Sequence, residues 1–100
     1  MADKKDLPAR AGSEAVGAYL RFLREAVGLS LVEAGDKIGM NPSQIWRLES
    51  GKADTRGSFL FKLIQAVDGD PNDVALLINN AAATKEDGER LARLRKQRKP

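Results

Sequence analysis

A chain of 100 residues with 42% apolar residues can build one small hydrophobic core but not two. It has no cysteine and no histidine, which excludes disulfides and thiolate metal sites and removes the commonest general base and zinc ligand. The longest apolar run, Val74 to Ile78, is too short to cross a membrane, and the N-terminus lacks the apolar segment of a signal peptide. We therefore expect a cytoplasmic, non-enzymatic domain with no cofactor, no metal and no membrane contact.

The net charge of +3 is unevenly distributed along the chain. Residues 1–12 hold three basic and two acidic residues, residues 13–83 hold seven and nine, and residues 84–100 hold seven and three. The central segment is thus slightly acidic. Affinity for a polyanion must come from local clusters or from the C-terminal end.

Residues 1–12 are polar and lack an apolar period, so they are predicted to form a flexible arm. Ser13 can cap the helix that follows, and Gly28 can end it. The predicted core face of this helix is a stripe at helical spacing, formed by Val16, Leu20, Leu23 and Val27.

Tyr19 and Phe22 lie beside that stripe, one turn apart. Two neighbouring aromatic residues at a helix surface indicate that another element covers them. The C-terminal segment, a second subunit or another protein could provide this cover.

Residues 30–52 predict two short helices joined by a tight turn. Ser30 and Glu33 have the S-x-x-E spacing of a capping box, and Gly39 can adopt the left-handed conformation that ends a helix. The inner face of this first helix is formed by Leu31, Ala34 and Ile38.

Asn41 and Pro42 can start the second helix, whose inward residues are Ile45 and Leu48. Its outer face then carries Ser43, Trp46, Arg47 and Ser50. Two short helices at a steep angle, with polar residues outside the second, are typical of motifs that enter the major groove of DNA.

Two more helices are predicted at residues 59–67 and 71–78. In the first, we expect Phe59, Leu60, Leu63, Ile64 and Val67 to lie mostly inward. In the second, Asp70 can cap the helix before Pro71, and Val74, Leu77 and Ile78 form the apolar side.

After a stretch of small residues, Thr84 and Asp87 could open a last helix. Only Leu91 and Leu94 are large and apolar there, so this basic tail is at most a marginal helix by itself. The sequence is compatible with three roles for this segment: a frayed tail, a contact with DNA phosphates, or a contact between subunits.

From Val16 to Ile78 the chain resembles the helix-turn-helix domains of the lambda repressor and Cro type, the XRE family. The resemblance rests on the blocks LRFLRE, GLS, IG and IWRLESGK, which occur in the family's order and spacing. It implies an all-α bundle of five helices, with a flexible arm at 1–12, a DNA-binding domain at 13–83 and a basic tail at 84–100. It further implies a transcriptional repressor that binds an inverted repeat of double-stranded DNA as a homodimer.

The resemblance also assigns roles to individual residues. The base-reading positions are Pro42, Ser43, Gln44 and Arg47, the phosphate-binding positions are Ser30, Lys52, Thr55 and Arg56, and the internal ion pair is Arg24 with Glu49. Arginine can bond bidentately to guanine and glutamine to adenine. Trp46 either contacts DNA sugars and methyl groups or packs on the neighbouring helix.

Two departures from the family pattern leave alternatives open. Leu31 stands where relatives often have a phosphate-binding glutamine, and Pro42 stands where many have a polar residue. The same fold could therefore serve an antitoxin that binds a partner protein through Tyr19 and Phe22, or an interaction module without DNA binding.

Overall fold

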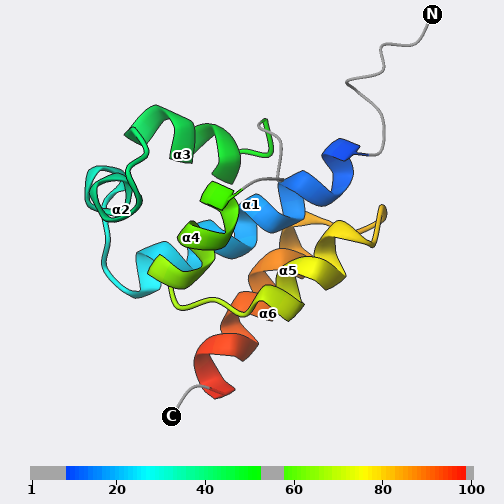
Figure 1. Cartoon of the computed structure of the whole chain (residues 1–100). Helices are drawn as coiled ribbons and strands as arrows, with labels where there is room; N and C mark the ends of the chain where they lie inside the picture. Colours follow the sequence, from blue (N-terminus) through cyan, green and yellow to red (C-terminus); the bar gives the residue numbers. More distant parts are fainter. Residues whose placement is uncertain (1–8, 53–57, 99–100) are drawn as a thin grey trace, which may run out of the picture.

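The computed structural model describes residues 9–52 and 58–98, and within these ranges the side chains of residues 13–52 and 59–98. These residues form six α-helices and no strand: α1 (Ala9–Ala26), α2 (Leu31–Ile38), α3 (Pro42–Glu49), α4 (Ser58–Ala66), α5 (Pro71–Ile78) and α6 (Lys85–Arg98) (Figure 1). The all-α prediction is confirmed, but the predicted count of five helices is wrong, because the basic C-terminal segment forms the sixth. Residues 1–8 of the predicted arm lie outside the described residues. Residues 9–12 belong to α1, so the predicted helix start at Ser13 is wrong.

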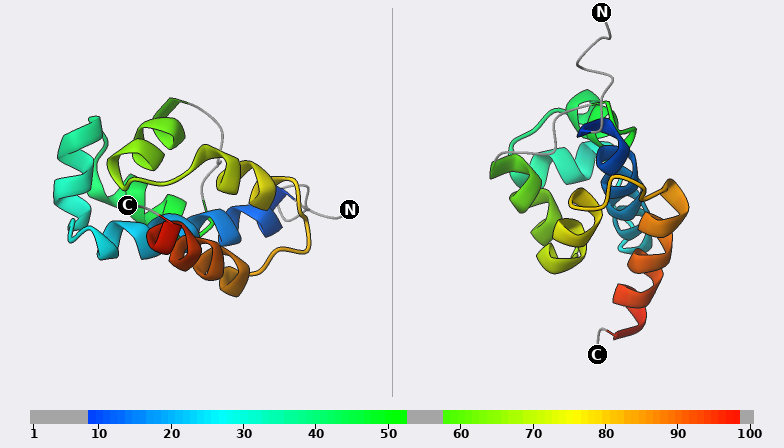
Figure 2. Two further views of the ribbon diagram at one scale, coloured as in Figure 1. Left: turned by 90° about the horizontal axis from the view of Figure 1, so that it is seen from below. Right: turned by 90° about the vertical axis from the view of Figure 1, so that its right-hand side faces the viewer.

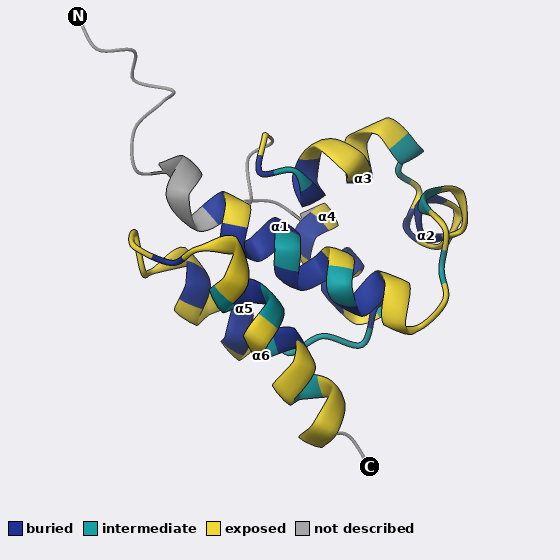
Figure 3. Cartoon of the chain, turned by 180° about the vertical axis from the view of Figure 1, so that it is seen from behind, coloured by how far each residue is buried: buried dark blue, intermediate teal, exposed yellow. Residues whose placement is uncertain are grey.

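Helix α1 runs through the middle of the molecule. It contacts α3, α4, α5 and α6, and α2 contacts α3 and α4. In both views of Figure 2, α4 and α5 lie on one side of α1 and α6 lies on the other. The predicted stripe residues Val16, Leu20 and Leu23 are buried, and they join the inner faces of the other helices in one core. Figure 3 shows this buried band along the middle of α1.

Three residues that were expected to face inward are instead exposed: Val27 (46%), Phe59 (43%) and Ile78 (42%). Helix α1 ends at Ala26, so Val27 lies in the turn and no longer follows the helical stripe. Phe59 and Ile78 each lie one residue outside the buried face of a short helix, about 100° around the helix axis from it.

Helix α6 begins at a cap of the type its sequence suggested. The Asp87 N–H donates to Thr84 Oγ1 at 3.2 Å, and the Thr84 N–H donates to Asp87 Oδ2 at 2.9 Å. The hydrogen bond from the Thr84 backbone lowers the pKa of the Asp87 carboxyl.

Helix α6 covers the aromatic face of α1. A Cβ at Gly88 would clash with the Ala15 carbonyl oxygen, so only glycine allows α6 to approach α1 this closely. Tyr19 is fully buried, and Phe22 is partly buried with the Arg93 guanidinium 5.7 Å from its ring centroid. The cover for the two aromatic residues is therefore intramolecular.

Polar contacts tie the buried Tyr19 to the start of α5. Its hydroxyl donates to Asp73 Oδ2 at 2.8 Å and accepts the Asp70 N–H at 2.9 Å. Burial raises the pKa of the Tyr19 phenol. Asp70 also caps α5, accepting the Asn72 N–H at 2.9 Å, so the capping prediction is confirmed.

Two possible features are absent from the described parts of the chain. No helix in residues 9–52 and 58–98 is both long and apolar enough to span a membrane. The same residues contain no group of three or more acidic side chains placed to hold a metal ion.

Candidate nucleic-acid interface

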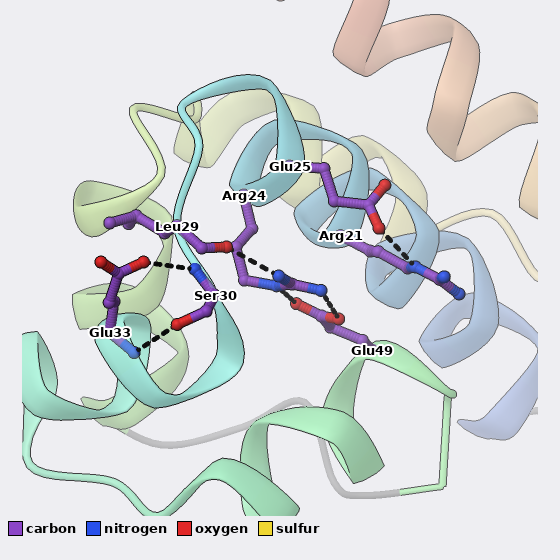
Figure 4. Close-up of polar contacts among 7 residues, drawn as sticks. All are labelled: Arg21, Arg24, Glu25, Leu29, Ser30, Glu33 and Glu49. Atoms are coloured by element: carbon purple, nitrogen blue, oxygen red, sulfur yellow. Dashed lines mark hydrogen bonds and ion pairs between the residues drawn. The ribbon is translucent and has the colours of Figure 1, made fainter.

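Helix α2 starts at a reciprocal capping box. The Glu33 N–H donates to Ser30 Oγ at 3.0 Å, and the Ser30 N–H donates to Glu33 Oε1 at 2.8 Å (Figure 4). The bond from the Ser30 backbone lowers the pKa of the Glu33 carboxyl. Ser30 is exposed, and its side chain also interacts with the Glu33 carboxylate.

The turn between α2 and α3 forms as the sequence indicated. Gly39 has φ 74°, a left-handed conformation that carries little cost for glycine, and its N–H donates to the Gly35 carbonyl at 2.8 Å. The chain then reaches Asn41, the N-cap of α3, and Pro42, the first residue of that helix. This tight connection projects α3 at the surface of the bundle, above α4 in Figure 1.

Two of the predicted base-reading residues also take part in the cap of α3. Gln44 and Asn41 form a second capping box, with the Gln44 N–H on Asn41 Oδ1 and the Asn41 N–H on Gln44 Oε1, both at 3.1 Å. Ser43 Oγ donates to the same Asn41 Oδ1 at 2.7 Å. The spacing N-x-x-Q in the sequence is the signal that could have revealed this second role.

The outer face of α3 is otherwise open. Ser43, Gln44 and Arg47 are exposed, and Pro42 is partly exposed. The Arg47 guanidinium makes only a long contact of 3.5 Å with the Lys52 carbonyl among the described residues. Its donors are thus presented to solvent at the surface.

Trp46 and Lys52 form a cation–π pair near Arg47. The Trp46 side chain is 49% exposed, and the Lys52 ammonium lies 5.2 Å from its ring centroid, within cation–π range. Lys52 is exposed and lies three residues after the end of α3. The two other proposed phosphate-binding residues, Thr55 and Arg56, lie outside the described residues.

A buried ion pair fixes the C-terminal end of α3. Arg24 Nε lies 2.6 Å from Glu49 Oε2, and its NH2 lies 3.0 Å from Glu49 Oε1, which makes the pair bidentate (Figure 4). Arg24 NH1 donates to the Leu29 carbonyl at 2.8 Å. The bonds to Glu49 raise the pKa of Arg24.

The position of this ion pair bears on the orientation of α2 and α3. The two side chains are only 10% and 3% exposed. One guanidinium links α1, the last residue of α3 and the residue before the cap of α2, so it holds both helices of the motif in one orientation. By contrast, the neighbouring Arg21 forms an exposed pair with Glu25 at 3.2 Å.

Comparison with known proteins agrees with this geometry. A family model described as a helix-turn-helix domain matches residues 15–77. An uncharacterized 15.4 kDa protein in the HgiDIIM 5' region of Herpetosiphon aurantiacus is 45% identical over 78 residues, which are 78% of this chain and 56% of the relative. The chain thus spans little more than half the length of that relative. No solved structure matches the chain significantly.

Proposed function

Because the chain belongs to the helix-turn-helix domain family, we propose that it is a transcriptional regulator that recognises a specific sequence in double-stranded DNA. The observation that carries the proposal is the open polar face of α3, held in a fixed orientation by the Arg24–Glu49 pair. A short exposed helix of this kind fits the major groove, where base edges carry a distinct pattern of donors and acceptors.

In this proposal Arg47 is the main base-reading residue. Its exposed guanidinium can donate two hydrogen bonds to O6 and N7 of guanine. Gln44 can donate from its amide while its oxygen stays in the cap of α3, and Ser43 and Pro42 contribute contacts of lower selectivity. Ser30, Lys52, Thr55 and Arg56 are the proposed phosphate contacts, which position the protein without reading the sequence.

We also propose a homodimer on an inverted repeat, with α5 as the contact between copies. From Pro71 to Ala82 the only charged residue is Asp73, which is buried, whereas Leu76 and Ile78 are 63% and 42% exposed. Charged residues are depleted in the centres of protein interfaces, and an uncharged surface is compatible with a second copy of itself. Such a dimer would act on DNA in the cytoplasm as a repressor, because an occupied operator excludes other proteins.

The case for a protein partner was based on an aromatic surface at Tyr19 and Phe22. Helix α6 covers this surface, so the antitoxin hypothesis loses the feature that favoured it. The departures at Leu31 and Pro42 remain compatible with DNA binding, since Ser30 is exposed and Pro42 can touch a thymine methyl group.

The decisive experiment is a selection from a random pool of duplexes with the purified protein. We expect one enriched motif with two-fold symmetry. Arg47→Ala should lose about 1 to 3 kcal/mol on the enriched duplex, relax the preference at one base pair and leave random DNA almost unchanged. Lys52→Ala should weaken both duplexes alike.

Lys62→Ala is the control for Arg47→Ala, because it removes an exposed basic residue from α4, which carries none of the proposed DNA contacts. Its affinity for a single enriched duplex should equal that of the unmodified protein. Failure to enrich any motif would contradict sequence-specific binding, and equal losses for Arg47→Ala on enriched and random DNA would remove Arg47 from base reading.

A further inference from the structure

The C-terminal half of α6 is the most basic stretch of the chain. Between Arg90 and Arg98 there are five basic residues and no acidic residue. Three of the basic residues, Arg90, Arg93 and Lys96, are exposed and recur every three residues along one side of the helix. They define what we call the α6 stripe.

The other two basic residues of this segment anchor the helix. Arg95 Nε donates to the Asp68 carbonyl at 3.1 Å, and Arg98 NH2 donates to Asp73 Oδ2 at 3.1 Å. Together with the close contact at Gly88, these bonds attach α6 to α1, to the α4–α5 turn and to α5. The α6 stripe is thus presented on a helix that is fixed to the core.

The stripe lies far from the recognition surface. In Figure 1 and in the right-hand view of Figure 2, α3 lies at the top of the molecule and the C-terminal end of α6 at the bottom. The two surfaces therefore lie toward opposite ends of a molecule whose principal extents are 46 × 28 × 19 Å. Within the stripe, Arg90 is paired with Asp87 at 2.8 Å and Arg93 lies over the Phe22 ring, so the stripe keeps a net positive charge that a polyanion can neutralise.

We propose that the α6 stripe binds the sugar-phosphate backbone of a second DNA duplex, so that the protein bridges two duplexes while α3 reads the first. This inference rests on the proposed function. The stripe spans about 9 Å along the helix axis at 1.5 Å per residue, which matches roughly three nucleotides of rise along one strand. Basic side chains at this spacing can contact successive phosphates without reading bases.

The composition of the stripe favours DNA over an acidic protein as the occupant. Protein interfaces are usually centred on aromatic and aliphatic side chains, and the only large apolar residue exposed in this half of α6 is Leu94, at 43%. Binding to a phosphate backbone requires basic groups alone, because the release of counterions supplies the free energy. A second copy of α6 is disfavoured because it carries the same charge.

The test is a two-duplex capture experiment with the full chain. A random-sequence duplex is fixed to beads, protein is added, and a fluorescent duplex of the same length is then offered in solution. Bridging appears as fluorescence on the beads, and it is normalised to the protein retained there. We compare Arg93→Glu/Lys96→Glu with a control of equal charge change on α2 and α4, Lys37→Glu/Lys62→Glu.

We expect the unmodified protein and the control to capture the fluorescent duplex, and the α6 variant to lose capture while retaining single-duplex binding. For a milder variant, Arg93→Gln/Lys96→Gln, the slope of log K against log salt for the capture step should fall by about two. Undiminished capture by the α6 variant would overturn the proposal, because two recognition helices of a dimer would then account for bridging.

The experiment also separates this inference from the proposed function. Single-duplex binding without any capture overturns bridging alone. The absence of single-duplex binding in the unmodified protein overturns both.

Discussion

Replacement of Arg24 by alanine should remove a large share of the folding free energy. The substitution leaves the Glu49 carboxylate, 3% exposed in the pair, without its two guanidinium donors, and leaves the Leu29 carbonyl without the bond from NH1. Removing one partner of a buried pair typically costs about 3 to 5 kcal/mol, because the remaining charge is uncompensated. A domain of this size has a total stability of about 5 to 15 kcal/mol.

Urea unfolding provides the assay, with the midpoint and slope measured for each variant. Arg21→Ala is a matched control on the same helix, since Arg21 and Glu25 are 63% and 56% exposed. Exposed pairs contribute about 0 to 1 kcal/mol, so this control should unfold almost like the unmodified protein. A loss for Arg24→Ala no larger than that for Arg21→Ala would refute the reasoning.

A double variant tests whether the uncompensated charge causes the loss. Arg24→Met/Glu49→Leu replaces both charges with apolar side chains, which is often neutral or stabilising. It should therefore be more stable than either Arg24→Ala or Glu49→Ala. If all three variants are equally destabilised, packing rather than charge dominates at this position.

The further predictions concern three positions in the core and at the proposed dimer contact. Tyr19→Phe should cost about 1 to 2 kcal/mol, because the Asp73 carboxylate loses a buried donor; urea unfolding measures the loss. Since burial raises the folded pKa of this phenol above the ordinary 10.0, the stability it contributes should be complete below pH 10 and decline above it. Tyr19 is the only tyrosine, so alkaline absorbance titration should show no tyrosinate near pH 10 while the protein is folded. Gly88→Ala should destabilise by about 1 to 3 kcal/mol through overpacking against Ala15, and thermal melts would detect it. Leu76→Glu should halve the mass in sedimentation without lowering the melting temperature of the domain; an unchanged mass would remove α5 from the dimer contact.

Helix α6 shows most clearly where sequence reasoning fell short. Its composition suggested a tail, because Leu91 and Leu94 are its only large apolar residues and could bury little surface for a helix of this length. Its packing depends instead on the small residues Gly88 and Ala92, which are buried against α1, and on bonds from Arg95 and Arg98 to other elements. Small residues and arginines are also common at solvent-exposed positions, so these partners become visible only once the chain is folded.

Local chemistry explains what the sequence alone determined. The cap and turn residues Ser30, Gly39, Asn41, Asp70 and Thr84 act on backbone groups within about three or four residues, so their effects follow from spacing. These interactions set the starts of α2, α3, α5 and α6 and the end of α2, and hence the helix-turn-helix unit. The outer position of Arg47 likewise follows from the inward positions of Ile45 and Leu48 on the same short helix.

Only the tertiary structure decided which surfaces remain open. The hydroxyl of Tyr19 meets a carboxylate 54 residues away, and α6 covers α1 across a similarly long separation. The exposure of Val27, Phe59 and Ile78 depends on where each short helix ends and on which neighbours lie beside it. Contacts between residues far apart in the sequence leave no period or spacing in the chain, so burial and the placement of the basic helix opposite α3 emerge only from packing.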